Sequence, residues 1–557
     1  MGEQEILGQL ASKEELDLAN WWHDLLGQKP SFDNFDLIKA IDTIPRTDIK
    51  AAEAIHTKFK NVLSYTEGRK QWYLWDGRIH TPCEGDNIAK NIGKLYYKAM
   101  VNALEFIKEY LNKEASKVEA SGTQAGKDEA AKIRAQYDKG EITKHKFYRD
   151  KVSSDAGLSA MIRMLQTESR VDYDHFDHDQ RWFVMRNKVL DLEELVAGNW
   201  VMVDHHPSRP VTKFFDAEYK EVRSEMVNLG HWDNFLKHSI PDEDARLYLQ
   251  KVTGAAFMGE SKLRTILNLH GPPGSGKSVY LGTFFKLGKG GAAYSCMPDS
   301  KSIIKAQGQN FEQDSFKGRR FIGVSEPPMG DAIDNEFLKK FTGDDWVETR
   351  TLNVKSSGWV PQGVVYVASN KPLKINTRDK AIVERVQMIE FPVEFEKDHP
   401  DPAKRRVKDL EKLIMDDRER VLEWVIQGMR RYITLDGRQL TPPESVLRLQ
   451  ADVVTEASSA LRWLTDTMDE GHLLIDYGQP DQYFLPVKDA YQRYTNWAVA
   501  CGEKHPLPMR FFQQDIENRY QGTVRADNMV RFKGINMTPE FRRISTLGGI
   551  GGLSGSA

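Results

Sequence analysis

The chain has 557 residues, of which 40% are hydrophobic and 29% are charged, and its formal net charge is −3. This length predicts about three or four domains of ordinary globular composition. The near-neutral charge excludes a chain that is basic throughout, so any DNA-binding charge must be local. No run of roughly 18 apolar residues occurs and the N-terminus is acidic, so we expect neither a transmembrane helix nor a signal peptide. Three widely spaced cysteines without a CxxC pair fit a reducing cytoplasm.

The first part of the chain predicts a mainly helical domain over residues 1–220. The segment "RKQWYLWDGRIHTP" interrupts it with a short strand pair around Asp76–Gly77. Residues 111–150 are polar nearly all round, which favours two exposed helices joined at Ser121–Gly122. Residues 180–220 alternate like short strands.

A helical block is expected over residues 221–262. Pro241–Asp242 indicates a helix start there, and Gly254 and Gly259 indicate the helix exit. From Leu263 the pattern changes to strand, glycine loop, helix and then buried strands such as "RFIGVSE" and "GVVYVASN", as in an α/β sheet. This organisation predicts the following further parts: an α/β core at residues 263–396, a helical linker at 397–440, a smaller domain at 441–545 and a disordered Gly/Ser-rich tail at 546–557.

A glycine-rich loop follows the first strand of the α/β core and matches the pattern GxxxxGK[ST]. Backbone N–H groups of such a loop converge on phosphate oxygens, and the following helix directs its positive end at them. Lys277 would reach the β- and γ-phosphates, and Ser278 would coordinate Mg²⁺. The sequence therefore predicts a site for ATP and Mg²⁺ formed by Gly271, Pro272, Pro273, Gly274, Ser275, Gly276, Lys277, Ser278 and Val279.

Polar side chains suited to a nucleoside triphosphatase follow the loop further along the chain. Glu326 closes the apolar run "FIGV" and is the strongest candidate for the carboxylate beside Mg²⁺ and the attacking water. Asn370 ends the next apolar strand, where it would contact the γ-phosphate or the water, although a simple strand-end turn is the alternative. Arg378 and Arg385 lie further on, and an arginine here would reach the ATP of a neighbouring subunit.

The loop, "SE", "KxxTGxD", "SNKP" and an arginine before "IEFP" occur in this order, which resembles superfamily 3 helicases. The resemblance is greatest to the helicase part of phage and plasmid primase-helicases and of the poxvirus primase-helicase. It extends upstream over "WYLWDG", "NKVLDL" and "WDNFLKHSIPDEDARLYLQKVTGAAFMG", and downstream over "VKDAYQRYTNWAVACGEKHPLPMRFFQQDI". It implies an AAA+-like P-loop ATPase core in an α/β fold, a mainly helical N-terminal domain without a primase catalytic domain, and a C-terminal winged-helix domain. It also implies that residues 221–262 form a helical collar that serves oligomerisation.

The resemblance also implies a role for each matching residue. Lys277 and Ser278 would form the Walker A pair, Glu326 the Walker B acid, Asn370 sensor 1 and Arg385 the arginine finger. The B-prime motif would consist of Lys339, Thr342, Gly343 and Asp345. The chain departs from the family in two places: the Walker B strand ends in a single acid, Glu326, and Asn187–Lys188 stands where Asn-Gly is usual.

Residues 348–363, "ETRTLNVKSSGWVPQG", predict a hairpin in which Lys355 to Gly358 form the turn. By resemblance this hairpin would enter the pore of a hexamer and grip a single DNA strand. Lys355 is the first choice for a phosphate contact, and Arg350 is the second, unless it lies at a subunit interface. Trp359 would stack on a base or pack at the base of the hairpin.

In the last domain, residues 510–520 predict a recognition helix. Residues 530–537 predict a wing that carries Arg531 and Lys533. Contact with a protein instead of DNA is an equal alternative for this pair of elements.

Two clusters upstream of the core have other interpretations. Asp172 and Asp174 imitate the paired acids of a primase, although no clear strand or downstream partner supports a metal site. His205 and His206 lack helical spacing and predict a surface loop.

The sequence thus predicts a homohexameric, ATP- and Mg²⁺-dependent DNA helicase of superfamily 3. It would act on single-stranded and forked DNA during phage or plasmid replication, in the host cytoplasm, with a separate primase or other replication proteins as partners. The alternatives are a bifunctional primase-helicase with a cryptic primase site, and a non-unwinding ATPase that loads replication proteins.

Overall fold

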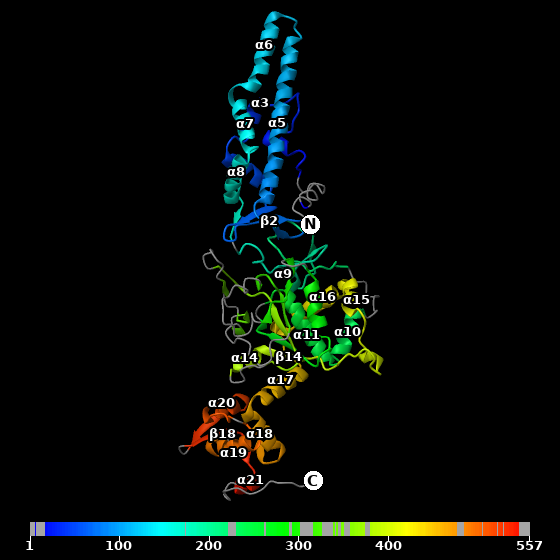
Figure 1. Cartoon of the computed structure of the whole chain (residues 1–557), viewed down its shortest axis with the longest axis vertical. Helices are drawn as coiled ribbons and strands as arrows, with labels where there is room; N and C mark the ends of the chain where they lie inside the picture. Colours follow the sequence, from blue (N-terminus) through cyan, green and yellow to red (C-terminus); the bar gives the residue numbers. More distant parts are fainter. Residues whose placement is uncertain are drawn as a thin grey trace.

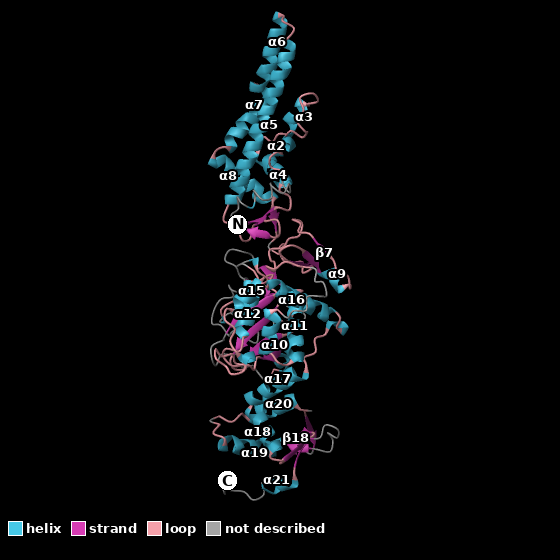
Figure 2. Ribbon diagram, turned by 90° about the vertical axis from the view of Figure 1, so that its right-hand side faces the viewer, coloured by secondary structure: helices cyan, strands magenta, loops and turns pink. Residues whose placement is uncertain are grey.

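The computed structural model describes residues 6, 17–172, 174–220, 230–260, 263–288, 292–300, 316–325, 338–339, 341–343, 347–349, 357–373, 379–475, 484–503, 505–520, 522–526 and 529–544. The molecule is elongated, with a helical N-terminal region at one end, an α/β body in the middle and a smaller domain at the other end (Figure 1). A view from the side shows the same three parts in a row (Figure 2). Among the described helices, none is long and apolar enough to cross a membrane.

The N-terminal region combines a helical stalk with a four-stranded sheet of order β3-β2-β1-β4. Its elements are α2 (Trp21–Leu25), α3 (Leu37–Thr43), α4 (Asp48–Lys58), β1 (Leu63–Thr66), β2 (Gln71–Trp75), β3 (His80–Pro82), α5 (Asn87–Glu119), α6 (Gln124–Ala135), α7 (Gly140–Val152), α8 (Asp155–Glu168) and β4 (Arg170–Val171), with a 3-10 turn at Gln136–Asp138.

The stalk is organised around α5, whose buried residues recur along one face from Ile88 to Ala115. The chain reverses at Ser121–Gly122, where Gly122 has a positive φ of 71°, and α6 returns along α5. The predicted helices joined at Ser121–Gly122 are therefore confirmed.

The predicted strand pair is also confirmed as the antiparallel hairpin β2–β3. The Asp76 carboxylate accepts hydrogen bonds from the backbone N–H groups of Arg78 and Ile79, at 2.9 and 2.8 Å. Gly77 adopts a φ of 91°, which glycine reaches without steric cost. The hairpin thus uses the side chain of its own turn to fix its register.

His80 is buried in β3 and connects this hairpin to the loop near Pro207. Its Nε2–H donates to the Pro207 carbonyl at 3.1 Å, so in the neutral ring Nδ1 carries no proton. Nδ1 is buried and lacks a hydrogen-bond partner among the described residues. Burial lowers the pKa of His80 to about 4.

We expect this histidine to make the protein sensitive to acid. The unfolded chain takes up a proton near pH 6.5, whereas folded His80 does so only near pH 4. Stability therefore falls as the pH drops between these values, by up to about 3 kcal/mol at 1.36 kcal/mol per pKa unit. Chemical unfolding at pH 7 and pH 4.5 measures this loss. His80→Gln keeps a donor for Pro207 but cannot titrate, so an equally steep loss in this variant would contradict the assignment.

Residues 180–220 form the predicted short strands, which pair as β5-β6-β7. The bounds are β5 (Trp182–Val184), β6 (Val189–Asp191), α9 (Leu192–Val196) and β7 (Met202–Val203).

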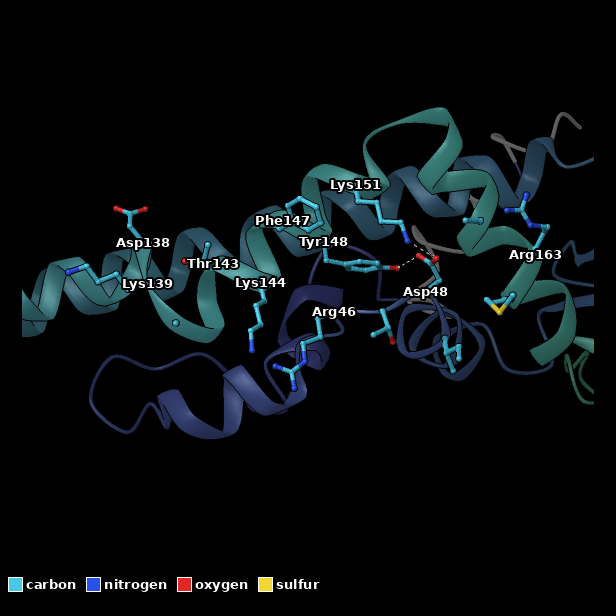
Figure 3. A pocket seen from close by; sticks show the side chains of 15 residues that line it. Arg46, Asp48, Asp138, Lys139, Thr143, Lys144, Phe147, Tyr148, Lys151 and Arg163 are labelled. Atoms are coloured by element: carbon cyan, nitrogen blue, oxygen red, sulfur yellow. Dashed lines mark hydrogen bonds and ion pairs between the residues drawn. The ribbon is translucent and has the colours of Figure 1, made fainter.

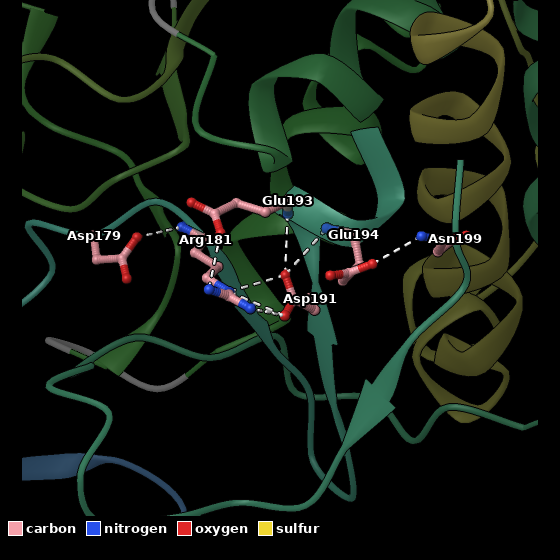
Figure 4. A network of polar contacts seen from close by, with 6 residues as sticks. All are labelled: Asp179, Arg181, Asp191, Glu193, Glu194 and Asn199. Atoms are coloured by element: carbon pink, nitrogen blue, oxygen red, sulfur yellow. Dashed lines mark hydrogen bonds and ion pairs between the residues drawn. The ribbon is translucent and has the colours of Figure 1, made fainter. Parts of the chain in front are cut away.

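A polar network ties these strands to α9 (Figure 4). Arg181 donates to the Asp191 carboxylate at 2.6 and 3.0 Å and pairs with Glu193 at 2.8 Å. Asp191 also caps α9 by accepting from the N–H groups of Glu193 and Glu194. Burial alone would raise the pKa of Asp191, but these hydrogen bonds hold it below its usual value.

The central body contains a parallel sheet of order β14-β8-β13-β10-β9, so the predicted α/β core with buried parallel strands is confirmed. Its elements are α10 (His231–Ser239), α11 (Glu243–Phe257), β8 (Ile266–His270), α12 (Lys277–Lys286), β9 (Ser295–Cys296), β10 (Phe321–Ser325), β11 (Val347–Thr349), β12 (Ser357–Trp359), β13 (Val364–Ser369), α14 (Lys380–Arg385), β14 (Val386–Glu390), α15 (Leu410–Asp416) and α16 (Arg418–Ile433). Helices α10, α11, α12 and α16 share one hydrophobic cluster with the sheet.

Helices α11 and α16 cross in direct backbone contact. A Cβ atom on Gly254 would lie 2.2 Å from the carbonyl carbon of Gly428. The prediction that Gly254 marks the exit of the helix is therefore wrong, because α11 continues to Phe257 and Gly254 instead permits close packing. Gly259, with a φ of 80°, follows the helix end as expected.

The C-terminal domain packs helices on a five-stranded sheet of order β15-β19-β16-β18-β17. Its elements are α17 (Glu444–Ala457), α18 (Ser459–Asp469), β15 (Leu473–Ile475), β16 (Phe484–Pro486), α19 (Val487–Ala500), α20 (Met509–Arg519), β17 (Thr523–Ala526), β18 (Met529–Lys533), β19 (Ile535–Met537) and α21 (Pro539–Ile544). The helix predicted at 510–520 is α20, and the segment 530–537 forms β18 and β19. The predicted tail at 546–557 lies outside the described residues.

Candidate functional site

The glycine-rich loop lies between β8 and α12, at the carboxyl edge of the parallel sheet, as the flanking pattern predicts. Gly276 caps α12 with a φ of 99°, and a Cβ atom there would lie 2.7 Å from the Phe235 ring. At Gly271 a Cβ atom would lie 2.1 Å from the Phe391 carbonyl oxygen. Only glycine fits these two positions, so packing against α10 and the strand end of β14 shapes the loop.

Lys277 is only 5% exposed and turns back into the loop. Its Nζ donates to the carbonyl oxygens of Gly271 and Pro272, both at 2.7 Å, and to the Ser275 hydroxyl at 3.1 Å. Ser278, one position further on, is exposed. The loop thus buries the ammonium group of Lys277 and leaves Ser278 exposed in the first turn of α12.

The strand register brings further polar groups to the same edge of the sheet. His270 at the end of β8 pairs with Ser369 at the end of β13, and Asn370 follows directly. Ser325 ends β10 opposite Ala368, one strand further across. The predicted sensor position Asn370 therefore lies on the strand adjacent to the loop strand, and its residue is exposed.

Asn268 is a buried residue of β8 that the sequence analysis missed. Its amide donates to the Val367 carbonyl at 3.0 Å and to the Ser369 hydroxyl at 2.8 Å, and its oxygen accepts from Leu373 N–H at 3.3 Å. Asn268 thereby fixes both sides of the turn that carries Asn370. The only signal in the sequence is a polar residue inside the apolar strand "ILNLH".

Several predicted site residues fall outside the part of the chain that the structure describes, and their roles stay predictions. Glu326 follows directly on Ser325, the last residue of β10. Glu326 lies outside the described part. Also outside it are Asp345, Arg350, Lys355, Arg378 and the side chain of Trp359.

The described part of the B-prime motif makes structural contacts. Lys339 pairs with Asp379, which precedes α14, at 2.6 Å, and its hydrogen bond lowers the pKa of Asp379. Thr342 is buried and its hydroxyl donates to the Leu338 carbonyl at 2.5 Å, while Gly343 is half-buried. Lys339 therefore links the motif to the helix that ends at Arg385.

The hairpin predicted over 348–363 is present as the antiparallel pair β11–β12, with Val347 opposite Trp359 and Thr349 opposite Ser357. The predicted turn is wrong in part, because Ser357 and Gly358 lie within β12. Their backbone groups pair with β11, and pairing extends the strand beyond the polar stretch. Residues 350–356 lie outside the described part of the chain.

Arg385 ends α14 at the opposite edge of the sheet from the loop of its own subunit. Val386, the next residue, pairs with Ile266 at the amino end of β8, whereas the loop follows His270 at the carboxyl end. At about 3.3 Å per residue the two ends of β8 lie roughly 13 Å apart. Arg385 therefore lies at the other end of the strand from the loop, and its role as an arginine finger stays a prediction.

Gln450 of α17, also missed by the sequence analysis, holds the end of α14 from the other side. Its buried amide donates to the carbonyl oxygens of Val383 and Val386, the latter at 2.9 Å. Together with the Lys339–Asp379 pair, this contact fixes both ends of α14.

Replacing Gln450 by Leu removes this donor while keeping the side-chain volume. Because two buried carbonyl groups then lose their partner, we expect the free energy of unfolding to fall by about 1–3 kcal/mol. Urea unfolding of the full chain measures the change. The exposed Gln492→Leu in α19 is the matched control, and equal stability of the two variants would contradict the role of Gln450.

The acidic and histidine-rich segments form loop contacts. Asp172 and Asp174 line a surface pocket of about 610 Å³ with His175 and His178. Across the described residues, no group of three or more His, Cys, Asp or Glu side chains is placed to hold a metal ion. His205 Nε2 donates to the Met185 carbonyl at 2.9 Å, as expected for a loop contact.

The fold and the site together define a mixed α/β protein with a glycine-rich loop at the carboxyl edge of a parallel sheet. The family model described as D5 N terminal like matches residues 52–240. A protein of Acanthamoeba polyphaga mimivirus named "Putative helicase L207/L206" is 24% identical over 236 residues, which is 42% of this chain and 24% of that protein. These matches confirm the resemblance that the motifs indicate.

Solved structures of the C-terminal region of NrS-1 also align with the chain. Its A-form apo structure has a TM-score of 0.34 and 12% identity, with 57% of this chain and 77% of that chain covered. A second apo structure has a TM-score of 0.34 and 10% identity, with 55% and 75% covered. The mimivirus match spans about a quarter of that protein's length.

Proposed function

We propose that the chain is one subunit of a ring-shaped, ATP-dependent DNA helicase of superfamily 3. It would translocate on single-stranded DNA at forks during phage or plasmid replication, in the host cytoplasm. The observation that carries the proposal is the placement of Lys277 and Arg385 at opposite edges of one sheet. A ring in which each subunit places its Arg385 against the next subunit's loop would complete every site.

Each described residue has a chemical task in this proposal. The ammonium group of Lys277 would exchange its hydrogen bonds to the loop carbonyls for contacts with the β- and γ-phosphates of ATP. Asn370 would orient the attacking water. The hydroxyl of Ser278 is exposed at the loop mouth and suits Mg²⁺, which prefers oxygen ligands. Glu326, the next residue in the sequence after β10, would complete that ligand set. Mg²⁺ would neutralise charge on the phosphate oxygens.

The strand order of the sheet, the C-terminal domain and the β11–β12 hairpin support the proposed class of helicase. Strand β13 lies between β8 and β10, so the predicted sensor strand would separate the loop strand from the Walker B strand. This agrees with an AAA+-like P-loop core. Helix α20 followed by the β17–β18 hairpin agrees with a winged-helix domain. The β11–β12 hairpin would present Lys355 to the DNA backbone, which predicts salt-dependent and sequence-tolerant binding.

Unwinding of a fluorescently labelled forked duplex tests the proposal. We expect strand separation with ATP and Mg²⁺, and none with Lys277→Ala or without nucleotide. ATP hydrolysis without strand separation would overturn the helicase assignment in favour of a loading ATPase. Template-directed primer synthesis that depends on Asp172 and Asp174 would instead favour a bifunctional enzyme.

A further inference from the structure

A wide groove crosses the N-terminal stalk, far along the chain from the phosphate loop (Figure 3). It has a volume of about 1180 Å³ and runs between the start of α4, the length of α7 and the middle of α8. Along α7 the lining residues recur three or four positions apart, from Gly140 through Lys144 and Phe147 to Lys151. This face is about 17 Å long at 1.5 Å per residue, which matches three turns of a helix.

Three apolar side chains in this groove are exposed. Phe147 is 76% exposed, Ile49 54% and Met164 36%, and they come from α7, α4 and α8. Burying such side chains is favourable, and aromatic and methionine side chains are enriched where proteins bind one another. A cluster from three separate helices therefore indicates a surface that a partner covers.

The charges around this cluster are mostly positive. Five basic and two acidic side chains line the groove, an excess of three positive charges. Glu141 beside the groove pairs with Arg46 and Lys144, and Asp48 pairs with Lys151 at 2.7 Å. The exposed Lys139 and Arg163 make no ion pair within the described part of the chain. These two cations at separate ends of the groove are complementary to carboxylates at the ends of a short segment.

We propose that this groove binds an acidic amphipathic helix of a partner protein. Its apolar ridge would cover Phe147, Ile49 and Met164, and its carboxylates would pair with Lys139, Lys144 and Arg163. This follows the recognition mode in which one helix face lies in an apolar groove.

A nucleic acid fits this surface less well. Bases stack on rows of aromatic side chains, whereas the groove exposes one aromatic beside the aliphatic Ile49 and Met164. Asp48 and Asp138 also line the groove and interrupt its basic residues, whereas a groove that follows a nucleic-acid backbone is continuously basic. The proposal is independent of ATP chemistry.

Fluorescence anisotropy on the full chain tests the proposal with a labelled 15-residue synthetic helix that carries Leu along one face and Glu on both flanks. We expect Phe147→Ala to weaken binding at least about tenfold, as for a central aromatic contact. Lys139→Glu with Lys144→Glu should also weaken it, and a peptide with Lys in place of Glu should then regain affinity. Ile38→Ala, which removes a 75% exposed side chain outside the groove, is the matched control.

Three kinds of result would overturn the proposal. The first is binding that does not depend on the proposed contacts. In that case a peptide with the same residues in shuffled order binds equally well, or Phe147→Ala has no effect. The second is Phe147-dependent binding of a labelled dT20 oligonucleotide without peptide binding, which would make the groove a DNA surface. The third is self-association of the wild-type chain that Phe147→Ala abolishes, which would make a second copy the occupant.

Discussion

Lys277→Ala is expected to lower ATP hydrolysis by at least about a hundredfold, since one preorganised charge at the reacting phosphates contributes several kcal/mol. The buried ammonium group is surrounded by loop carbonyls at 2.7 Å, so the loop shape is set before phosphate arrives. Alanine removes the cation but leaves Gly271 and Gly276 to shape the loop. Nucleotide binding should therefore weaken without loss of the fold.

Phosphate release measured at saturating ATP, with thermal unfolding in parallel, checks this result. Lys286→Ala, on the same helix but exposed and paired with Glu411, is the matched control. A Lys277→Ala variant that hydrolyses ATP within about threefold of the wild-type rate would remove the loop from the proposed mechanism.

Arg385→Ala is expected to lower hydrolysis by about a thousandfold or more in the assembled protein, the usual effect of losing an arginine finger. The variant should keep its own nucleotide affinity, because Arg385 lies at the far end of β14 from the loop. Arg431→Ala, an exposed arginine at the end of α16, should hydrolyse ATP like the wild type.

A mixing experiment separates action on a neighbour from action within one subunit. Arg385→Ala subunits keep an intact loop, and Lys277→Ala subunits keep an intact finger. If the finger acts on the neighbour, an equal mixture should regain hydrolysis at about a quarter of its sites, because only one of the four pairings is productive. No regained activity in mixtures that assemble, as judged by sedimentation, would show that Arg385 does not act between subunits.

The sequence predicted those features that depend on local pattern. The loop between a strand and a helix, the Asp76 turn and the β11–β12 hairpin all follow from residue order over short distances. Turn limits were less predictable, since Ser357 and Gly358 are residue types common in turns but pair with β11. Backbone pairing across the hairpin outweighed local preference.

Residues that act through distant partners were not predictable. Asn268 bonds to Ser369, 101 positions away, and Gln450 bonds to Val386, 64 positions away. In a single sequence each is merely a polar residue in an apolar or helical run. Gly254 was misassigned for the same reason, because its partner Gly428 belongs to another helix.

The length of α5 has a mechanical consequence. Its 33 residues span about 50 Å at 1.5 Å per residue, and one end lies beside β2 while the other lies at the far tip of the stalk (Figure 1). A rotation of about 10° at the base would move that tip by roughly 9 Å. A small tilt of the stalk beside the α/β body would therefore produce a large displacement of α6 and of any partner bound there.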